Sequence, residues 1–294
     1  MPWRRQPAHS AELLAHWQAL GQALGRDTPA WRAEGRRLLR SWARWPRAYH
    51  DTTHLRACLR HLQAVQDHQP GALHNPHAVA LALWYHDAIY WPWSGHNEAR
   101  SADWARQFLL GQGLPTTLAE TVHQHVMDTR HTPGPLTGDA LWVVDIDLAI
   151  LGQSDAVYRQ FERNVRREYF FVRWPRYVAG RSAVLQGFLD RPHIYGTDYF
   201  AQRYEAQARA NLQQALSALG QGQQPRQTGQ DRICQDQEKA CGKSRPPAPE
   251  QQRRTSRPPR CQQRQLGTYR NIWGKNRPWA QAHGRFCANF LLAG

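Results

Sequence analysis

The chain has 294 residues, a length that suits one large domain or two small ones. Hydrophobic residues make up 41% of it and charged residues 21%, which allows a buried core and excludes collagen, a coiled coil and disorder throughout. The formal net charge is +15, but residues 221–294 hold 14 Lys/Arg against 4 Asp/Glu, so the excess positive charge lies mainly in the last quarter.

Apolar residues recur at intervals of three and four along residues 1–220, and alternating strand-like runs are nearly absent, so the sequence predicts an all-α fold. The predicted helices cover, in chain order, residues 10–25, 30–45, 51–68, 76–90, 98–111, 116–130, 139–151, 154–172, 177–190 and 198–219. Cap residues support several of these boundaries. Asn75 before Pro76 opens the fourth helix, and Gly25 and Gly220 stand where helices should stop.

Residues 221–294 are rich in Gln, Pro and Arg and have almost no apolar periodicity. Such a segment buries too little apolar surface to offset the entropy of ordering it, so we expect a disordered basic tail after a helical domain over residues 1–220. This tail is a dispensable extension, an out-of-frame read-through, or an electrostatic contact with RNA, DNA or an anionic membrane. If nucleic acid is a partner, we expect this tail alone to contact it.

The sequence also bears on the compartment of the protein. The most apolar run, residues 141–151, contains Asp145 and Asp147 and is too short to span a membrane. The N-terminus lacks the apolar stretch and cleavage site of a secretory signal, so we expect a cytoplasmic protein. The five cysteines are too few and too irregularly spaced for a disulfide scaffold or a Cys-x-x-Cys zinc site, and we interpret them as free thiols.

Histidines on apolar predicted helices are the first candidates for functional residues. His86 and Asp87 end the apolar run AVALALWYHDAIY, where an imidazole beside a carboxylate is costly to bury unless the two are paired or bind a metal. His54 lies on an earlier predicted helix and can face the same interior as its apolar stripe, which includes Cys58. Imidazole is the commonest metal ligand in proteins.

Two acids complete the pattern. Asp145 and Asp147 lie in LWVVDIDLAILG, a mostly apolar helix on which an internal cation would explain them. Singly, a helical histidine is more often a hydrogen-bonded core residue, and an aspartate in an apolar run often caps something. Together, the nitrogen and oxygen ligands favour a site for a divalent ion such as Mn, Fe, Co, Zn, Ni or Mg.

The blocks YHDTTHL, ALALWYHDAIY, NEARSA and DIDLAILG, in this order, resemble the HD superfamily of metal-dependent phosphohydrolases. More narrowly, they look like a bacterial subfamily of predicted HD phosphohydrolases with a Tyr-His-x-x-x-His opening, a Trp-Tyr-His-Asp centre and an Asn-Glu-x-x-Ser-Ala block. The likeness covers residues 31–219. It implies an HD-type helical bundle that hydrolyses a phosphate ester or phosphoanhydride, in a nucleotide or a small phosphorylated metabolite.

The resemblance also implies a ligand set. The family's metal ligands fall on His54, His86, Asp87 and Asp147, with Asp145 as the second choice for the last position. Only one of the two helix acids should reach the metal, because residues two positions apart point about 200° apart on a helix.

Three more histidines are candidates near the site. His131 would hold a second metal if the site is binuclear, with His125 in the same block; each is otherwise a surface histidine at a helix end. His50 either supports a ligand from behind or caps a turn.

Water is the nucleophile that the resemblance implies. Asp87 would ligate the metal and orient or deprotonate this water. Arg100, and either Arg166 or Arg167, would clamp the phosphate, and Glu98 would align a histidine or a water. Each has a plainer alternative: Glu98 sits at a helix start, where acids favour the helix dipole, and the arginines would be solvated.

Two rival functions come from other classes. One is a binding or regulatory module that keeps the HD scaffold and acts through the basic tail. The other is different metal chemistry on the same fold, because some HD relatives are oxygenases with two irons. Metal content, phosphate release and an absorption band from a di-iron centre separate these alternatives.

Overall fold

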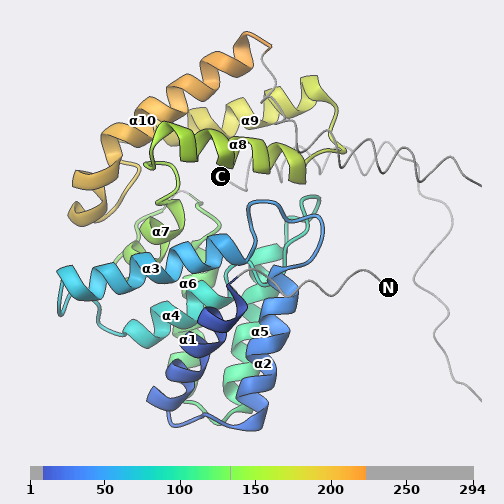
Figure 1. Ribbon diagram of the computed structural model, residues 1–294. Helices are drawn as coiled ribbons and strands as arrows, with labels where there is room; N and C mark the ends of the chain where they lie inside the picture. Colours follow the sequence, from blue (N-terminus) through green and yellow to red (C-terminus); the bar gives the residue numbers. More distant parts are fainter. Residues whose placement is uncertain (1–8, 133, 223–294) are drawn as a thin grey trace, which may run out of the picture. The chain divides into compact units, whose positions relative to one another are not determined.

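A computed structural model describes residues 9–132 and 134–222 (Figure 1). Within these residues the fold is all-α, with ten helices and no strand. The helices are α1 (Ser10–Ala23), α2 (Pro29–Trp42), α3 (Thr52–His68), α4 (Pro76–Tyr85), α5 (Asn97–Gly111), α6 (Thr116–Asp128), α7 (Asp139–Leu148), α8 (Asp155–Glu168), α9 (Trp174–Leu189) and α10 (Asp198–Gly220). The all-α prediction is confirmed for this part of the chain. Apart from its first two residues, the predicted tail, 221–294, lies outside the described residues.

All ten predicted helices are present, and their caps follow the local sequence. The Asn75 side chain accepts a hydrogen bond from Ala78 N at 3.0 Å, with Pro76 in the first turn of α4. Gly25 follows α1 with a φ of +65°, a left-handed conformation that glycine adopts without strain.

Several predicted boundaries were wrong by a few residues. The clearest case is α4, which ends at Tyr85 rather than at residue 90. Beyond it, the Arg47 guanidinium donates to the carbonyls of Asp87 at 2.6 Å and Ala88 at 3.2 Å, and Ser41 Oγ also donates to Ala88. These side chains occupy carbonyls that a continuing helix would have used, so the chain leaves the helix at the His–Asp pair.

Other boundaries differ as well: α2 ends at Trp42 rather than 45, α7 at Leu148 rather than 151 and α8 at Glu168 rather than 172, and α9 begins at Trp174 rather than 177.

Helix α4 lies at the centre of this arrangement. Every residue from Ala78 to Tyr85 is buried, and α4 packs against α3, α5, α6 and α7. A helix that is apolar on all sides is stable only when other helices surround it.

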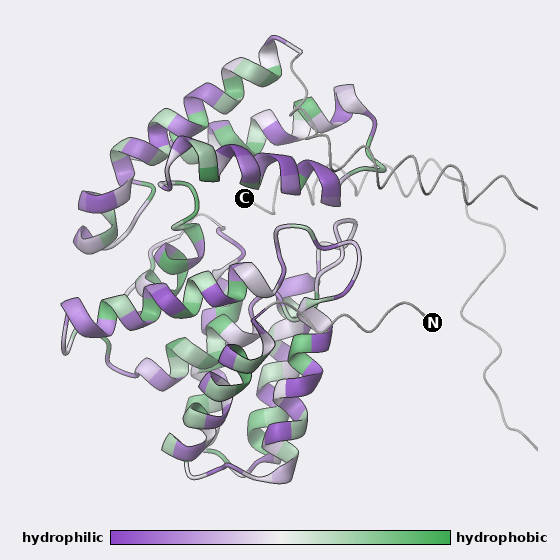
Figure 2. Ribbon diagram, viewed as in Figure 1, coloured by the Kyte–Doolittle hydropathy of each residue, from purple (hydrophilic) through white to green (hydrophobic). Residues whose placement is uncertain are grey.

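Helix α8, by contrast, is strongly amphipathic, and Figure 2 shows hydrophilic residues in purple along much of it. Helices α8 and α9 both pack against α10.

Two tryptophans join α1 to α2. The Trp17 and Trp31 rings stack with centroids 4.6 Å apart, and each indole N–H donates to the other residue's carbonyl, at 2.7 and 2.9 Å. The close approach requires glycine, because a Cβ at Gly21 would overlap the Trp31 ring and a Cβ at Gly35 would overlap the Trp17 ring.

No helix in the described part of the chain combines the length and the apolar character needed to cross a membrane.

Candidate metal centre

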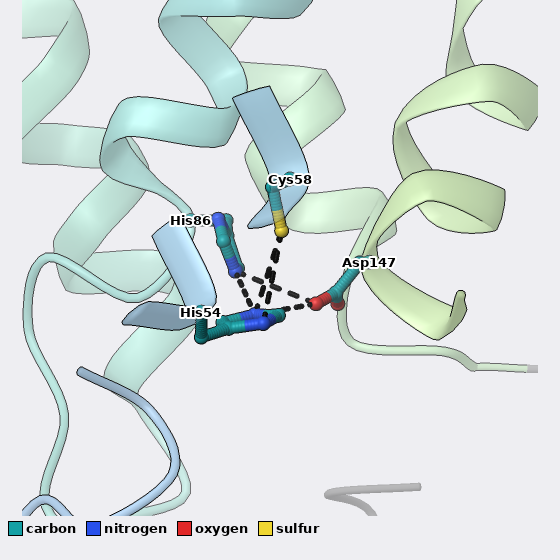
Figure 3. Close-up of side chains that lie close together, drawn as sticks. All are labelled: His54, Cys58, His86 and Asp147. Atoms are coloured by element: carbon teal, nitrogen blue, oxygen red, sulfur yellow. Dashed lines mark hydrogen bonds and ion pairs between the residues drawn. The ribbon is translucent and has the colours of Figure 1, made fainter. Parts of the chain in front are cut away.

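Three helices bring donor atoms together in the interior. His54 lies in the first turn of α3, where the Asp51 carboxylate accepts hydrogen bonds from Thr53 N at 2.7 Å and His54 N at 3.4 Å and fixes the start of the helix. His86 directly follows α4, and Asp147 lies in the last turn of α7. Figure 3 shows the three side chains pointing toward one another.

The donor atoms form a small triangle. His54 Nε2 lies 3.2 Å from His86 Nε2 and 3.0 Å from Asp147 Oδ1, and His86 Nε2 lies 3.5 Å from Asp147 Oδ1. Ligands about 2.0–2.1 Å from one ion are about 3.3 Å apart in tetrahedral geometry and about 3.0 Å apart in octahedral geometry. We call these three atoms the donor triangle. Their spacing and chemistry fit one face of the ligand shell of a divalent ion.

Neighbouring groups orient the two imidazoles. His86 Nδ1 lies 2.9 Å from the Leu83 carbonyl, and a carbonyl only accepts, so Nδ1 carries the hydrogen and Nε2 is left facing the donor triangle. The Tyr49 hydroxyl, which can donate or accept, lies 3.1 Å from His54 Nδ1 and orients that ring. Hydrogen bonds on the far nitrogen commonly orient metal-binding histidines.

The electrostatics of the site favour a positive charge. Burial lowers the pKa of His86, but the carboxylates of Asp87 and Asp147 outweigh it and raise this pKa to about 9. Burial raises the pKa of Asp147, but the His86 charge and hydrogen bonds with His131 and His54 outweigh it and hold this pKa well below its usual range. These two partly buried carboxylates therefore favour a cation beside them, either a proton on the imidazole or a metal ion.

Two side chains lie next to the donor triangle. Asp87 Oδ2 is 3.5 Å from His86 Nε2. Cys58 Sγ is 3.7 Å from both ring nitrogens of His54, and the ligand atoms of Cys58, His54, His86 and Asp147 all lie within 4.8 Å of one another. These four residues could hold a metal ion.

Sequence reasoning assigned Cys58 to the apolar stripe and not to the site. The residue is buried and is a free cysteine, and burial raises the pKa of its thiol well above the usual value. A usable signal was present, because a residue four positions after His54 lies on the same face of α3.

Asp145 and Asp147, near the end of α7, face different parts of the molecule. Asp147 contributes to the donor triangle, whereas Asp145 accepts hydrogen bonds from Gly196 N and Thr197 N, both at 2.8 Å, and from Thr197 Oγ1 at 2.6 Å. Asp145 therefore anchors the start of α10, and the structure brings only Asp147 to the donor triangle.

His131 approaches the same acid from another side. Its Nε2 lies 3.2 Å from Asp147 Oδ2, the oxygen that is not in the donor triangle. Its Nδ1 is buried and has no hydrogen-bond partner among the described residues. His125 is not among the residues around the donor triangle, and its Nδ1 lies 3.7 Å from Asp128. A second metal at His131 stays a prediction.

Glu168, which the sequence did not single out, fixes the chain just before α3. Its fully buried carboxylate accepts hydrogen bonds from the backbone N–H groups of Ala48, Tyr49 and His50 at 2.7–3.0 Å, and from the Tyr90 hydroxyl at 2.8 Å. His50 Nδ1 is 2.6 Å from it. Burial raises the pKa of Glu168, but the charge and hydrogen bond of His50 and the backbone N–H groups outweigh it and lower this pKa to about 2.

A cavity of about 150 Å³ opens beside the donor triangle. His86, Asp87, Glu98, His131 and Asp147 supply acidic and imidazole groups to its wall. Burial raises the pKa of Glu98, and the nearby charge of Asp87 adds to this effect. The cavity thus joins the candidate metal ligands to a carboxyl group whose pKa is raised.

The arginines expected to clamp phosphate do not line this cavity. Arg100 is exposed on another surface, and Arg167 is exposed on α8. Arg166 donates hydrogen bonds to the carbonyls of Tyr169 at 2.5 Å and Val172 at 3.1 Å, which holds the chain after α8.

Arg130 does line the cavity, although sequence reasoning passed over it. Its position beside His131, in a block already singled out for its histidines, was the available signal.

Comparisons with known protein families, with curated proteins and with solved structures gave no match to this chain. The likeness to the HD superfamily therefore rests on the sequence blocks themselves and stays a prediction.

Proposed function

We propose that this chain is a metal-dependent hydrolase of a phosphate ester or phosphoanhydride. The observation that carries the proposal is the donor triangle, whose three atoms lie 3.0–3.5 Å apart beside a cavity lined by Asp87 and Glu98. The order of the sequence blocks around His54, His86 and Asp147 supports the same reading.

His54, His86 and Asp147 would hold the ion, with Asp87 or Cys58 beside them. A divalent ion bound there supplies a water of lowered pKa and screens charge on a phosphate oxygen.

The surrounding side chains have separate tasks in the reaction. Asp87 orients the water and accepts its proton as the water oxygen bonds to phosphorus. The bond from phosphorus to the leaving oxygen breaks, and Glu98, whose pKa is raised by burial, supplies the proton that this oxygen takes up. The products are phosphate and the alcohol, or a second phosphate when the substrate is an anhydride.

Metal content and phosphate release test the proposal together. The purified full-length protein should contain close to one divalent ion per chain or more, and should release phosphate from a panel of phosphorylated metabolites with Mn, Co, Ni, Mg or Zn. His86→Ala and Asp147→Ala should lose both the metal and the activity.

Matched controls come from α3, where Asp67 and His68 are exposed. Asp67→Ala and His68→Ala should keep both properties, and circular dichroism establishes that each variant is folded. Metal binding that survives in folded His86→Ala and Asp147→Ala, or a metal-loaded protein that hydrolyses no member of the panel, would contradict the proposal.

A further inference from the structure

The cavity beside the donor triangle has a second, apolar part. Side chains from α7 to α9 form this wall: Leu148, Ile150, Leu151, Phe161, Val184 and Phe188. Arg181 also reaches the wall, but its guanidinium donates to Glu162 at 2.6 and 3.2 Å. These donors are already used by a carboxylate. This part of the wall is therefore suited to hydrocarbon rather than to sugar hydroxyl groups.

Arg130 supplies a positive charge to the same cavity. Among the described residues, its guanidinium makes no hydrogen bond and no close ion pair, although its charge acts on Glu98 and opposes the rise in the pKa of that carboxyl. It precedes His131, whose Nε2 is 3.2 Å from Asp147 Oδ2, and both residues line the cavity. A guanidinium that no carboxylate holds in a close ion pair can bind two oxygens of a phosphate group through its planar fork.

The size of the cavity limits what it can enclose. A volume of about 150 Å³ is below the lower end of the range of about 300–1,000 Å³ that encloses drug-sized ligands. An apolar cavity of about this size holds a benzene-sized group. The space therefore suits a phosphoryl group with a short chain or a single ring, and a nucleotide is too large to be enclosed.

Exposed aromatic rings continue the apolar surface from the edge of the cavity. Trp91 lines the cavity, and its ring lies 5.2 Å from that of Trp93, which in turn lies 5.7 Å from Phe171. Trp93 is 43% exposed and Phe171 is 38% exposed. An apolar group that projects from the cavity would meet these rings rather than water alone.

We propose that the substrate is a small phosphate monoester of an apolar alcohol, with its phosphate between the donor triangle and Arg130 and its alkyl or aryl group against the apolar wall. This inference rests on the proposed function for the metal, and it names the class of substrate that the same site accepts.

Alkylphosphonates test the inference, because their carbon–phosphorus bond resists hydrolysis. Calorimetry on the full-length, Mn²⁺-loaded protein compares methylphosphonate, butylphosphonate and 3,4-dihydroxybutylphosphonate. Each buried methylene should tighten binding about threefold to fourfold, so butylphosphonate should bind at least tenfold tighter than methylphosphonate. The affinity of 3,4-dihydroxybutylphosphonate should lie close to that of methylphosphonate, because its hydroxyl groups have no partners on the apolar wall.

Two variants separate the phosphate contact from the apolar contact. Arg130→Gln should weaken methylphosphonate and butylphosphonate alike, by about tenfold. Val184→Thr, which keeps the volume of the side chain, should weaken butylphosphonate but not methylphosphonate. The matched controls, Arg36→Gln on an exposed residue and Val178→Thr on the same helix but outside the cavity, should change neither.

Butylphosphonate that binds no tighter than methylphosphonate, or no tighter than its dihydroxy form, overturns the inference. So does Arg130→Gln with unchanged affinity. Butylphosphonate selectivity without hydrolysis of butyl phosphate supports the assigned phosphate and apolar contacts but rejects the proposed function and, with it, the role of the ligand as a substrate. Hydrolysis of phosphate esters without a preference for butylphosphonate over methylphosphonate supports the proposed function and rejects the apolar substrate class.

Discussion

Glu168→Gln is the substitution whose effect follows most directly from the structure. The buried carboxylate accepts hydrogen bonds from three consecutive backbone N–H groups, of Ala48, Tyr49 and His50, and also pairs with the His50 side chain. Glutamine keeps the shape of the side chain and one acceptor oxygen but removes the charge. The variant therefore isolates the contribution of that charge to the segment that leads into α3 and His54.

The magnitude follows from the pKa of Glu168, which is lowered from 4.5 to about 2. At about 1.4 kcal/mol per pKa unit, this shift corresponds to roughly 3 kcal/mol of folding free energy at neutral pH. Because the folded pKa lies below the unfolded one, this contribution is present above pH 4.5 and is lost as the pH falls toward 2. We expect Glu168→Gln to lower the free energy of unfolding by about 3 kcal/mol at pH 7, and the difference from the wild type to shrink at low pH.

Urea denaturation at a series of pH values measures this difference. Glu120→Gln is the matched control, because Glu120 pairs with Arg106 at 2.5 Å but the two side chains are 48% and 44% exposed. Exposed ion pairs contribute about 0–1 kcal/mol, so this control should change stability little. A change below 0.5 kcal/mol for Glu168→Gln at pH 7, or one that stays constant between pH 5 and pH 3, would refute the reasoning.

Three further predictions concern packing and the site. Gly35→Ala should lower the free energy of unfolding by about 1–3 kcal/mol, because its Cβ would overlap the Trp17 ring. Gly111 has open space around it, so Gly111→Ala should not lower this free energy. Thermal unfolding measures both variants. Asp145→Asn should lower the melting temperature but keep the metal content of the protein, because its partners lie at the start of α10. Asp87→Ala should weaken Mn²⁺ binding at least tenfold in a titration, and Cys58→Ala should weaken it less than threefold, because carboxylate suits Mn²⁺ better than thiolate does. A larger loss of Mn²⁺ affinity for Cys58→Ala than for Asp87→Ala would refute this assignment.

The sequence was sufficient for the helices, because their apolar spacing and caps are local properties. Asn75 and Gly25 act as the sequence predicts, at the ends of α4 and α1. The end of α4 was missed because it depends on Arg47, a residue about forty positions earlier in the chain whose hydrogen bonds to the Asp87 and Ala88 carbonyls are a tertiary feature.

The donor residues could be found because buried imidazoles and acids are unusual on apolar helices. The angle of about 200° between residues two apart on a helix predicted that only one of Asp145 and Asp147 reaches the donor triangle, and the resemblance to the HD superfamily favoured Asp147. Which arginines line the cavity could not be predicted, because the local sequence around a charged residue on an amphipathic helix does not indicate whether its side chain faces a cavity or solvent. Glu168 gave no signal either, since it acts on residues about 120 positions away.

The central claim is that His54, His86 and Asp147 hold one divalent ion. The most direct measurement is an anomalous difference map from crystals of the metal-loaded, full-length protein, recorded at the absorption edge of the bound metal. We predict one strong peak about 2.0–2.2 Å from His54 Nε2, His86 Nε2 and Asp147 Oδ1. Full metal loading with the peak elsewhere in the molecule, or no peak beside these three atoms at saturating metal, would contradict the claim.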